Sequence, residues 1–157
     1  MSEDVVTVER VIRATPEAIF ALLCDPRRHH EFDGSGTVGA AKGVPPKLEL
    51  GATFGMDMRL GVPYSMVSRV VEYDENRRLA WQTVPPYPFA DRIAGGRIWR
   101  YELEPVEGGT LVRESWDITH EKLTKVLVRQ AAAKTRDNMT RTLKRIEQVL
   151  TGHAEQA

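Results

Sequence analysis

The spacing of apolar residues near the C-terminus constrains the fold more than any other feature of the chain. From His120 to about Thr151, apolar side chains recur every three or four residues, which is the spacing of one face of an α-helix. Gly152 then provides a helix stop. The sequence therefore predicts one long helix whose Lys and Arg side chains lie mostly on a solvated outer face. Its buried stripe is expected to be Leu123, Leu127, Ala131, Thr135, Met139, Leu143, Ile146 and Leu150.

Strand-like runs separated by turn residues occupy most of the chain before this helix. Thr15 and Pro16 predict a helix directly after the first run, and Asp25-Pro26 begins a short second helix that ends near Phe32. Gly, Pro, Asp and Asn residues divide the later runs at short intervals, which is typical of an antiparallel meander. The expected strands are residues 7–13, 38–42, 50–60, 64–73, 79–84, 97–103 and 111–118.

The order of these elements predicts the architecture. One strand, two short helices, further strands and one long helix make an α+β domain, in which a curved antiparallel sheet of about seven strands grips the C-terminal helix. Nothing divides the chain, so we predict a single domain over residues 1–152 and a disordered tail over residues 153–157. A twisted sheet curls, and one helix does not cover its concave face, so an internal cavity is expected.

Alternation along the strands predicts which side chains face this cavity. The inward set is rich in aromatic rings and methionine, which suits flat or flexible apolar ligands, although the same residues could simply fill the core. The separation is weak in residues 64–73, where Val67 and Val71 point the other way. The predicted ligand-binding residues are Phe54, Met56, Met58, Tyr64, Met66, Ser68, Val70, Trp81, Trp99, Tyr101, Leu103, Val112, Glu114, Trp116, Leu123, Leu127, Tyr87 and Phe89.

Glu114 is the most informative polar residue in this set and the one candidate catalytic group. It falls on the inner face between Val112 and Trp116, where a carboxylate is costly unless it is paired, hydrogen-bonded or protonated. It could orient a ligand hydroxyl or act as a general acid or base. The alternatives are a structural ion pair with Arg97 or with an arginine of another element, or an error of one residue in the strand phase. The chain contains no complete catalytic constellation, so catalysis stays open.

Two other segments draw attention. His29 and His30 are adjacent on a short helix, so their side chains point about 100° apart, and no third ligand accompanies them. We therefore predict no metal site and place this pair near the cavity mouth. The loop at residues 85–96, with Tyr87 and Phe89, is long for a connection between neighbouring strands and is a candidate lid, or else a cap on the core.

Composition limits the classes of function. Lys plus Arg is 22 and Asp plus Glu is 22, and this balance argues against a nucleic-acid-binding protein or one built for an anionic membrane. No run approaches the roughly 18 apolar residues of a membrane span, and no export signal is present. The single cysteine, Cys24, favours a reducing cytoplasm. We expect no cofactor, and the oligomeric state is open.

Several motifs resemble those of a known superfamily. VERVI at residues 8–12 followed by TPEAIF at 15–20 is similar to the start of the START-like, or helix-grip, superfamily (SRPBCC). VVEYDENRRLAW at 70–81 resembles its central hairpin, and WRYELEP at 99–105 with GGTLVRESW at 108–116 resembles its last two strands. The similarity is greatest to the bacterial polyketide cyclase/dehydrase-like branch. It implies a fold, because the superfamily has no shared catalytic signature.

Three functions stay open at this point. The leading hypothesis is binding or transport of a small hydrophobic molecule, such as a lipid, a polyketide or an aromatic metabolite, in the internal cavity. The second is an aromatase/cyclase-type enzyme in which Glu114, Tyr101 or Tyr64 moves protons. The third is a protein-binding module like the heat-shock-protein ATPase activators of the superfamily, which would need a filled interior and an exposed apolar patch.

Overall fold

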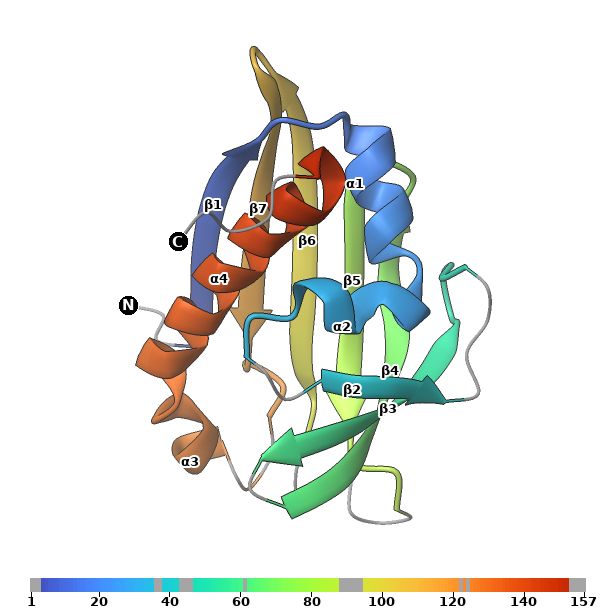
Figure 1. Cartoon of the computed structure of the whole chain (residues 1–157). Coiled ribbons are helices and arrows are strands. Elements are labelled where there is room, and N and C mark those ends of the chain that lie inside the picture. The colour runs from blue at the N-terminus through green and yellow to red at the C-terminus, as the bar shows by residue number, and fades with distance from the viewer. Residues whose placement is uncertain are drawn as a thin grey trace.

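Seven strands form one antiparallel sheet in the part of the chain that the computed structural model describes, namely residues 4–35, 38–42, 47–60, 62–87, 95–121, 123 and 125–152. Their order across the sheet is β1-β7-β6-β5-β4-β3-β2, so the first strand lies beside the last. Figure 1 shows the sheet curving behind the helices. The strands are β1 (Val5–Ile12), β2 (Val38–Lys42), β3 (Thr53–Leu60), β4 (Val62–Asp74), β5 (Arg78–Val84), β6 (Arg97–Val106) and β7 (Gly109–Asp117).

Two short helices follow β1, as the sequence predicts. Helix α1 (Pro16–Leu23) begins at Thr15, whose Oγ1 accepts a hydrogen bond from the backbone N–H of Ala18 at 3.1 Å. A 3₁₀ turn η1 (Pro26–Arg28) leads into α2 (His29–Phe32). The predicted α+β architecture is confirmed.

The prediction of one long C-terminal helix is wrong in its first third. The structure instead has α3 (Lys125–Arg129) and α4 (Ala132–Thr151). Between them, the N–H groups of Gln130 and Ala131 bond to carbonyls three residues back rather than four. Leu123 and Leu127 are 80% and 68% exposed, so burial of these two side chains does not hold the segment in line with α4.

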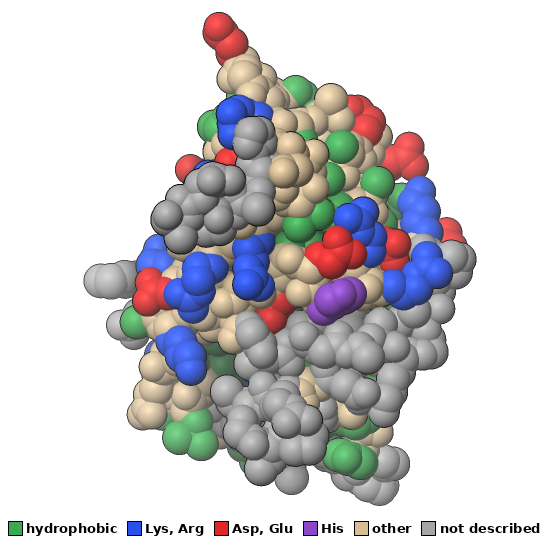
Figure 2. Space-filling view, in the orientation of Figure 1, with side chains coloured by type: hydrophobic (Ala, Val, Ile, Leu, Met, Phe, Trp, Pro, Cys, Tyr) green, Lys and Arg blue, Asp and Glu red, His purple; other side chains and the backbone are tan. Residues whose placement is uncertain are grey.

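The remainder of the predicted stripe holds along α4. Thr135, Met139, Leu143 and Ile146 are buried against the sheet, whereas Ala131 is exposed. Gly152 adopts the left-handed conformation and its N–H bonds to the carbonyl of Gln148 at 3.0 Å, which ends the helix as predicted. Figure 2 shows Lys and Arg side chains on the outer face of the molecule over α4, with acidic side chains among them.

A β-bulge explains the weak alternation in β4. Val70 pairs with Trp81 and Glu72 pairs with Ala80, so Val71 is an extra residue without a partner in this register. The extra residue reverses which side chains face inward. Tyr73 therefore returns to the core, where its ring contacts Phe20 edge to face at a centroid distance of 5.4 Å.

The helices cover one face of the sheet unevenly. Figure 1 shows α4 crossing that face obliquely, with α1 and α2 beside it. Next to α1 and the C-terminal half of α4, the interior is closely packed, and we refer to this region as the filled half. Its buried side chains include Ile12, Ile19, Leu22, Leu23, Leu79, Leu103, Val112, Leu143 and Ile146. The rest of the concave face, the hollow half, contains the cavity described below.

Some predictions concern residues for which the structure gives no placement. Residues 153–157, predicted to be a disordered tail, lie outside the described residues, as does most of the candidate lid at residues 85–96. The single-domain boundary therefore stays a prediction. Among the described residues, no helix is both long enough and apolar enough to cross a membrane.

Candidate ligand cavity

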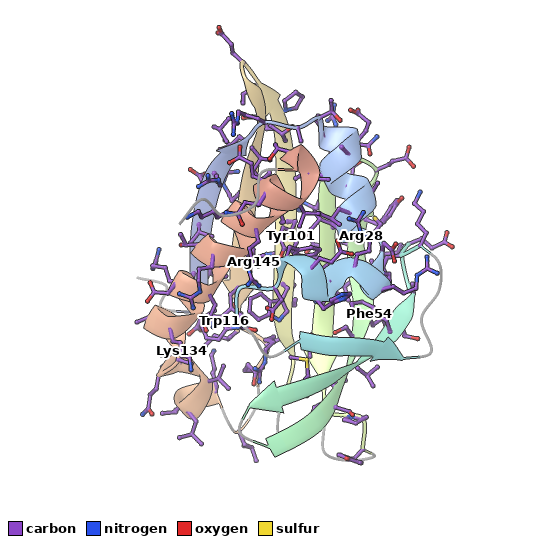
Figure 3. All side chains as sticks on the ribbon, in the orientation of Figure 1. Arg28, Phe54, Tyr101, Trp116, Lys134 and Arg145 are labelled. Carbon is purple, nitrogen blue, oxygen red and sulfur yellow. The ribbon has the colours of Figure 1, made fainter. Side chains whose placement is uncertain are left out.

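A cavity of about 570 Å³ lies between the hollow half of the sheet and the helices above it. Its floor is made of successive rows of side chains that run across the strands. The middle row contains all three tryptophans of the chain, Trp81 on β5, Trp99 on β6 and Trp116 on β7, which are paired neighbours in the sheet register. Figure 3 shows Trp116 and Tyr101 between the sheet and the helices. The three indole rings make this part of the floor apolar.

His29 on α2 forms part of an aromatic wall. Its ring stacks on Trp81 with a centroid distance of 5.1 Å and an interplanar angle of 20°, and Phe54 contacts both rings edge-on. Nε2 lies 2.8 Å from the carbonyl oxygen of Leu23 and donates to it, because a carbonyl only accepts. Burial lowers the pKa of His29 to about 4, so the ring is neutral at pH 7.

A second pair of side chains makes a polar centre in this apolar cavity. The hydroxyl of Tyr101 donates to Oε2 of Glu114 at 2.9 Å, and the two residues are paired neighbours on β6 and β7. Oε1 of Glu114 is buried and has no hydrogen-bond partner among the described residues. Burial raises the pKa of Glu114 to about 8; the bond from Tyr101 opposes this rise, and the charge of Asp33 adds to it.

The loop after α2 brings Asp33 to the cavity. Gly34 lies so close to α4 that a Cβ atom there would come 2.2 Å from the carbonyl oxygen of Asn138, so only glycine fits. The N–H of Gly34 donates to Oγ1 of Thr142 at 2.9 Å, and Arg145 donates to the carbonyl oxygen of Asp33 at 2.6 Å. These bonds fix the loop to α4 and set the position of the Asp33 carboxylate.

Arg97 does not form the ion pair with Glu114 that the sequence left open. Its Nε donates to Glu121 at 2.9 Å, and its backbone N–H donates to the same oxygen at 3.0 Å. Glu121 is buried, so this pair fastens the start of β6 to the segment after β7. Within the described residues, no group of three or more His, Cys, Asp or Glu side chains is arranged to hold a metal ion.

Residues 4–151 match the protein family described as polyketide cyclase / dehydrase and lipid transport. The chain belongs to this family. The sequence resemblance to the START-like superfamily, polyketide cyclase/dehydrase-like branch, is thereby confirmed. In this member of the family, the geometry above is a mostly apolar pocket lined by one buried carboxyl group, that of Glu114.

Relatives with a curated name carry no assigned activity. An uncharacterized protein of Mycobacterium tuberculosis strain H37Rv is 40% identical over 107 residues, which is 66% of this chain and 43% of that protein. Its counterpart in strain CDC 1551 is 39% identical over the same length. The chain thus spans less than half the length of the curated relatives it matches.

Solved structures share the family's fold at low sequence identity. A solution structure from Arthrobacter aurescens has a TM-score of 0.73 at 15% identity and covers 97% of this chain and 88% of that chain. A crystal structure from Chromobacterium violaceum has a TM-score of 0.71 at 14% identity, covering 94% and 97%. DynU16, a protein in the dynemicin biosynthetic locus, has a TM-score of 0.65 at 14% identity, covering 94% and 47%. These similarities show the fold alone.

Most of the described residues predicted to bind a ligand in this family member lie around the cavity. Their role in binding stays a prediction, because no bound molecule tests it. Those that line the cavity are Phe54, Met58, Met66, Ser68, Trp81, Trp99, Tyr101, Glu114, Trp116 and Leu127.

Other predicted residues lie elsewhere. Val70, Leu103 and Val112 are inward-facing as predicted, but they are packed into the core instead of lining the cavity. Leu123 and Tyr87 are 80% and 66% exposed and lie outside the cavity wall, because neither the start of the helical segment nor the described start of the loop folds over it. The side chains of Met56 and Tyr64, and the whole of Phe89, lie outside the described residues.

The sequence reasoning missed part of the helical wall. Asn138 and Thr142 on α4 line the cavity together with Thr135 and Met139. The spacing of these four residues, at three or four positions apart, is the signal that could have found them, since they share one helical face. Asp33 and Thr83 also line the cavity. Oγ1 of Thr83 lies 2.9 Å from Oγ of Ser68.

Proposed function

We propose that this protein binds a small hydrophobic molecule, such as a lipid, a polyketide or an aromatic metabolite, in the cavity of its hollow half. The observation that carries the proposal is an internal space of about 570 Å³ walled by three tryptophans, Phe54 and methionines. Small-molecule sites typically measure roughly 300–1,000 Å³ and are mostly apolar with a few placed polar groups. The family description, which joins polyketide chemistry and lipid transport, supports the same class of ligand.

Tryptophan emission offers a direct test, because all three tryptophans line the cavity. An uncharged apolar probe such as N-phenyl-1-naphthylamine is expected to quench this emission while its own fluorescence rises. Native mass spectrometry of the purified protein would detect a ligand retained from the cell. Absence of saturable binding for a panel of uncharged apolar compounds would contradict the proposal.

A matched pair of variants locates the binding site. Ala131, just before α4, lines the cavity, whereas Ala133, two residues on, lies outside the cavity wall, although both residues are exposed. Ala131→Phe should narrow the mouth and weaken probe binding about tenfold, a loss of about 1.4 kcal/mol. Ala133→Phe should leave the affinity unchanged. Equal melting temperatures of the two variants would exclude a general loss of stability.

The hydrogen-bonded Tyr101–Glu114 pair favours a second candidate, a polyketide cyclase-type enzyme. A buried carboxyl group whose pKa is raised to about 8 has the properties of a general acid near neutral pH. If the protein is an enzyme, Glu114→Gln should abolish turnover of a polyketide-like substrate and only weaken its binding. The protein-binding alternative requires a filled interior, and the cavity argues against it.

The cellular setting follows from weaker observations and stays a prediction. Cys24 is buried, and burial raises the pKa of its thiol to about 11, so it is a packing residue with little thiolate character. This is compatible with a cytoplasmic location. The absence of a nucleic-acid partner rests on the charge balance alone.

A further inference from the structure

One buried polar atom beside the cavity lacks a partner among the described residues, and it indicates the chemistry of the ligand. Glu114 is 2% exposed, and its Oε1 has no hydrogen-bond partner among the described residues. The same residue lines the cavity. Buried polar atoms are nearly always satisfied in folded proteins, so a buried carboxyl oxygen left unpaired beside a cavity is suited to meet a group of the bound molecule.

The surroundings of Glu114 decide which protonation state it adopts. On β1 its paired neighbour is the apolar Val8, and on β6 it is Tyr101. From the helical side, α4 contributes neutral Thr135, Asn138 and Met139 to the same cavity, and the loop after α2 contributes Asp33. The cations in the described wall are Arg97, which binds Glu121, and Lys134, which is exposed at the start of α4. His29, the other titratable group there, is neutral at pH 7.

This environment favours the protonated acid. Burial raises the pKa of Glu114 to about 8, against the opposing bond from Tyr101, and the charge that acts on it is the negative one of Asp33. Because Oε2 already accepts the hydroxyl hydrogen of Tyr101, the acidic hydrogen belongs on Oε1. At neutral pH, Oε1 is therefore a hydrogen-bond donor in an apolar cavity.

We propose that Glu114, as a neutral donor, selects uncharged ligands that carry an acceptor oxygen, such as a ketone or ester carbonyl, and discriminates against anionic amphiphiles such as fatty-acid carboxylates. This inference rests on the proposed function of the cavity. A carbonyl oxygen at Oε1 satisfies the unpaired atom without bringing a charge into the interior. A ligand carboxylate would lie near two acidic side chains, Glu114 and Asp33, and would lose its hydration.

Three fluorescent probes with the same ring system test the inference. They are 6-propionyl-2-(dimethylamino)naphthalene, which has a ketone, 6-propyl-2-(dimethylamino)naphthalene, in which a methylene replaces the carbonyl, and 6-(dimethylamino)-2-naphthoate, which is anionic. At pH 7 the ketone should bind about tenfold more tightly than the propyl probe, because the two differ only at the carbonyl that accepts the hydrogen bond, and tenfold corresponds to about 1.4 kcal/mol. Its emission should shift to the red as its carbonyl accepts the bond. The naphthoate should bind more weakly than either.

The pH dependence and two variants identify Glu114 as the donor. Ketone affinity should be constant below about pH 7 and fall by about tenfold in total as Glu114 ionises, while the affinity of the propyl probe changes much less. Glu114→Gln keeps a donor in the same place, so ketone affinity should stay within about threefold of wild type and lose its pH dependence. Glu114→Met should bind both neutral probes equally. Circular dichroism would verify that each variant is folded.

The possible outcomes separate this inference from the function on which it rests. If no probe binds, the cavity is not a binding site and both proposals fail. If the neutral probes bind equally to wild type, the protein still holds apolar molecules, but the selective role of Glu114 is wrong. Ketone affinity that rises above pH 8, or that disappears in Glu114→Gln, would mean that a neutral Glu114 donor does not hold the carbonyl, which also overturns the inference.

Discussion

The filled and hollow halves of this protein lie on the same face of the same sheet, yet one is closely packed and the other encloses about 570 Å³. The strands beneath them alternate in the same way. Over the filled half, α1 inserts Ile19, Leu22 and Leu23, and α4 adds Leu143 and Ile146. Over the hollow half, α4 presents the smaller and more polar Thr135, Asn138 and Thr142. The comparison teaches that the covering helices, not the sheet, determine where the cavity lies.

The buried carboxyl groups of Glu147 and Glu114 also differ between the filled and hollow halves. Glu147 on α4 accepts from Nη2 of Arg10 at 2.8 Å and from the backbone N–H of Arg13 at 3.0 Å, so both its oxygens are bonded. Glu114 in the hollow half has one bonded oxygen and one without a partner among the described residues. The first group connects a helix to β1, and the second is the group that we propose meets a ligand. The carboxyl group with both oxygens hydrogen-bonded thus has a structural role, and the one with an unpaired oxygen is the candidate for ligand binding.

The largest expected effect is the dependence of stability on pH through Glu114. Its pKa is about 8 in the folded protein against an ordinary value of 4.5. As pH rises through this range, the unfolded chain releases the proton first, so the wild type loses up to about 1.4 kcal/mol of stability per pH unit. The unfolding free energy of Glu114→Gln, measured in urea, should therefore rise relative to that of wild type by on the order of 4 kcal/mol between pH 5 and pH 8.

Glu147→Gln is the matched control for that experiment. Burial acts to raise the pKa of Glu147, but the bonds from Arg10 and Arg13 outweigh burial and hold it below its ordinary value of 4.5. Its contribution is present above that pH and is lost as pH falls. Glu147→Gln should destabilise the protein at pH 7. As pH rises, its unfolding free energy should fall relative to that of wild type, whereas that of Glu114→Gln should rise. A constant difference between wild type and Glu114→Gln across the pH range would show that Glu114 is not a buried acid.

Two truncations in α4 compare packing in the two halves directly. Leu143 and Met139 lie one turn apart and are each 1% exposed, but only Met139 lines the cavity. Leu143→Ala should lower the unfolding free energy by about 3–4 kcal/mol, as is usual for a closely packed core. Met139→Ala should cost about 2 kcal/mol, the low end of the usual range for Met→Ala, because the residue packs beside the cavity, where the neighbouring side chains are less constrained than in the filled half. Equal losses in urea denaturation would contradict the distinction between the halves.

Acid should weaken the aromatic wall of the hollow half through His29. Burial lowers the pKa of this ring to about 4 from an ordinary 6.5, so its contribution is present above pH 6.5 and is lost as pH falls towards 4. The loss should be about 3 kcal/mol at most. His29→Gln keeps a donor for the carbonyl of Leu23 and should flatten this part of the stability curve. If the curves of wild type and variant run parallel between pH 7 and pH 4, His29 is not buried as a neutral ring.

The smallest effect concerns the helix that covers the filled half. Thr15→Ala removes the bond that Thr15 accepts from Ala18 and should cost about 1 kcal/mol of stability. Because α1 does not line the cavity, probe affinity should not change. Thr140→Ala, on the exposed side of α4, removes a side-chain bond to the carbonyl of Arg136 and should be nearly neutral. A change of probe affinity in Thr15→Ala would mean that the two halves are coupled.

Much of this fold could be predicted from local patterns. The cap at Thr15, the glycine stop at Gly152 and the alternation of β5 to β7 each depend on a few neighbouring residues, and each holds in the structure. The same alternation placed Glu114 on the inner face. The break between α3 and α4 could not be predicted, because Leu123 and Leu127 continue the apolar spacing of the helix in the sequence although both side chains are exposed in the structure. Likewise, the bulge at Val71 depends on the register of a neighbouring strand.

The sequence by itself determined the order of elements, the inner face of most strands and the presence of a buried acid among aromatic rings, because these follow from periods of two and about 3.6 residues. Only the tertiary structure decided which inward residues touch a cavity and which are packed under α1. It also decided that Arg97 binds Glu121, so that no cation pairs with Glu114 in the part of the chain that the structure describes. Such pairings join elements far apart in the chain, and their energies depend on the spacing between layers, which no local pattern records.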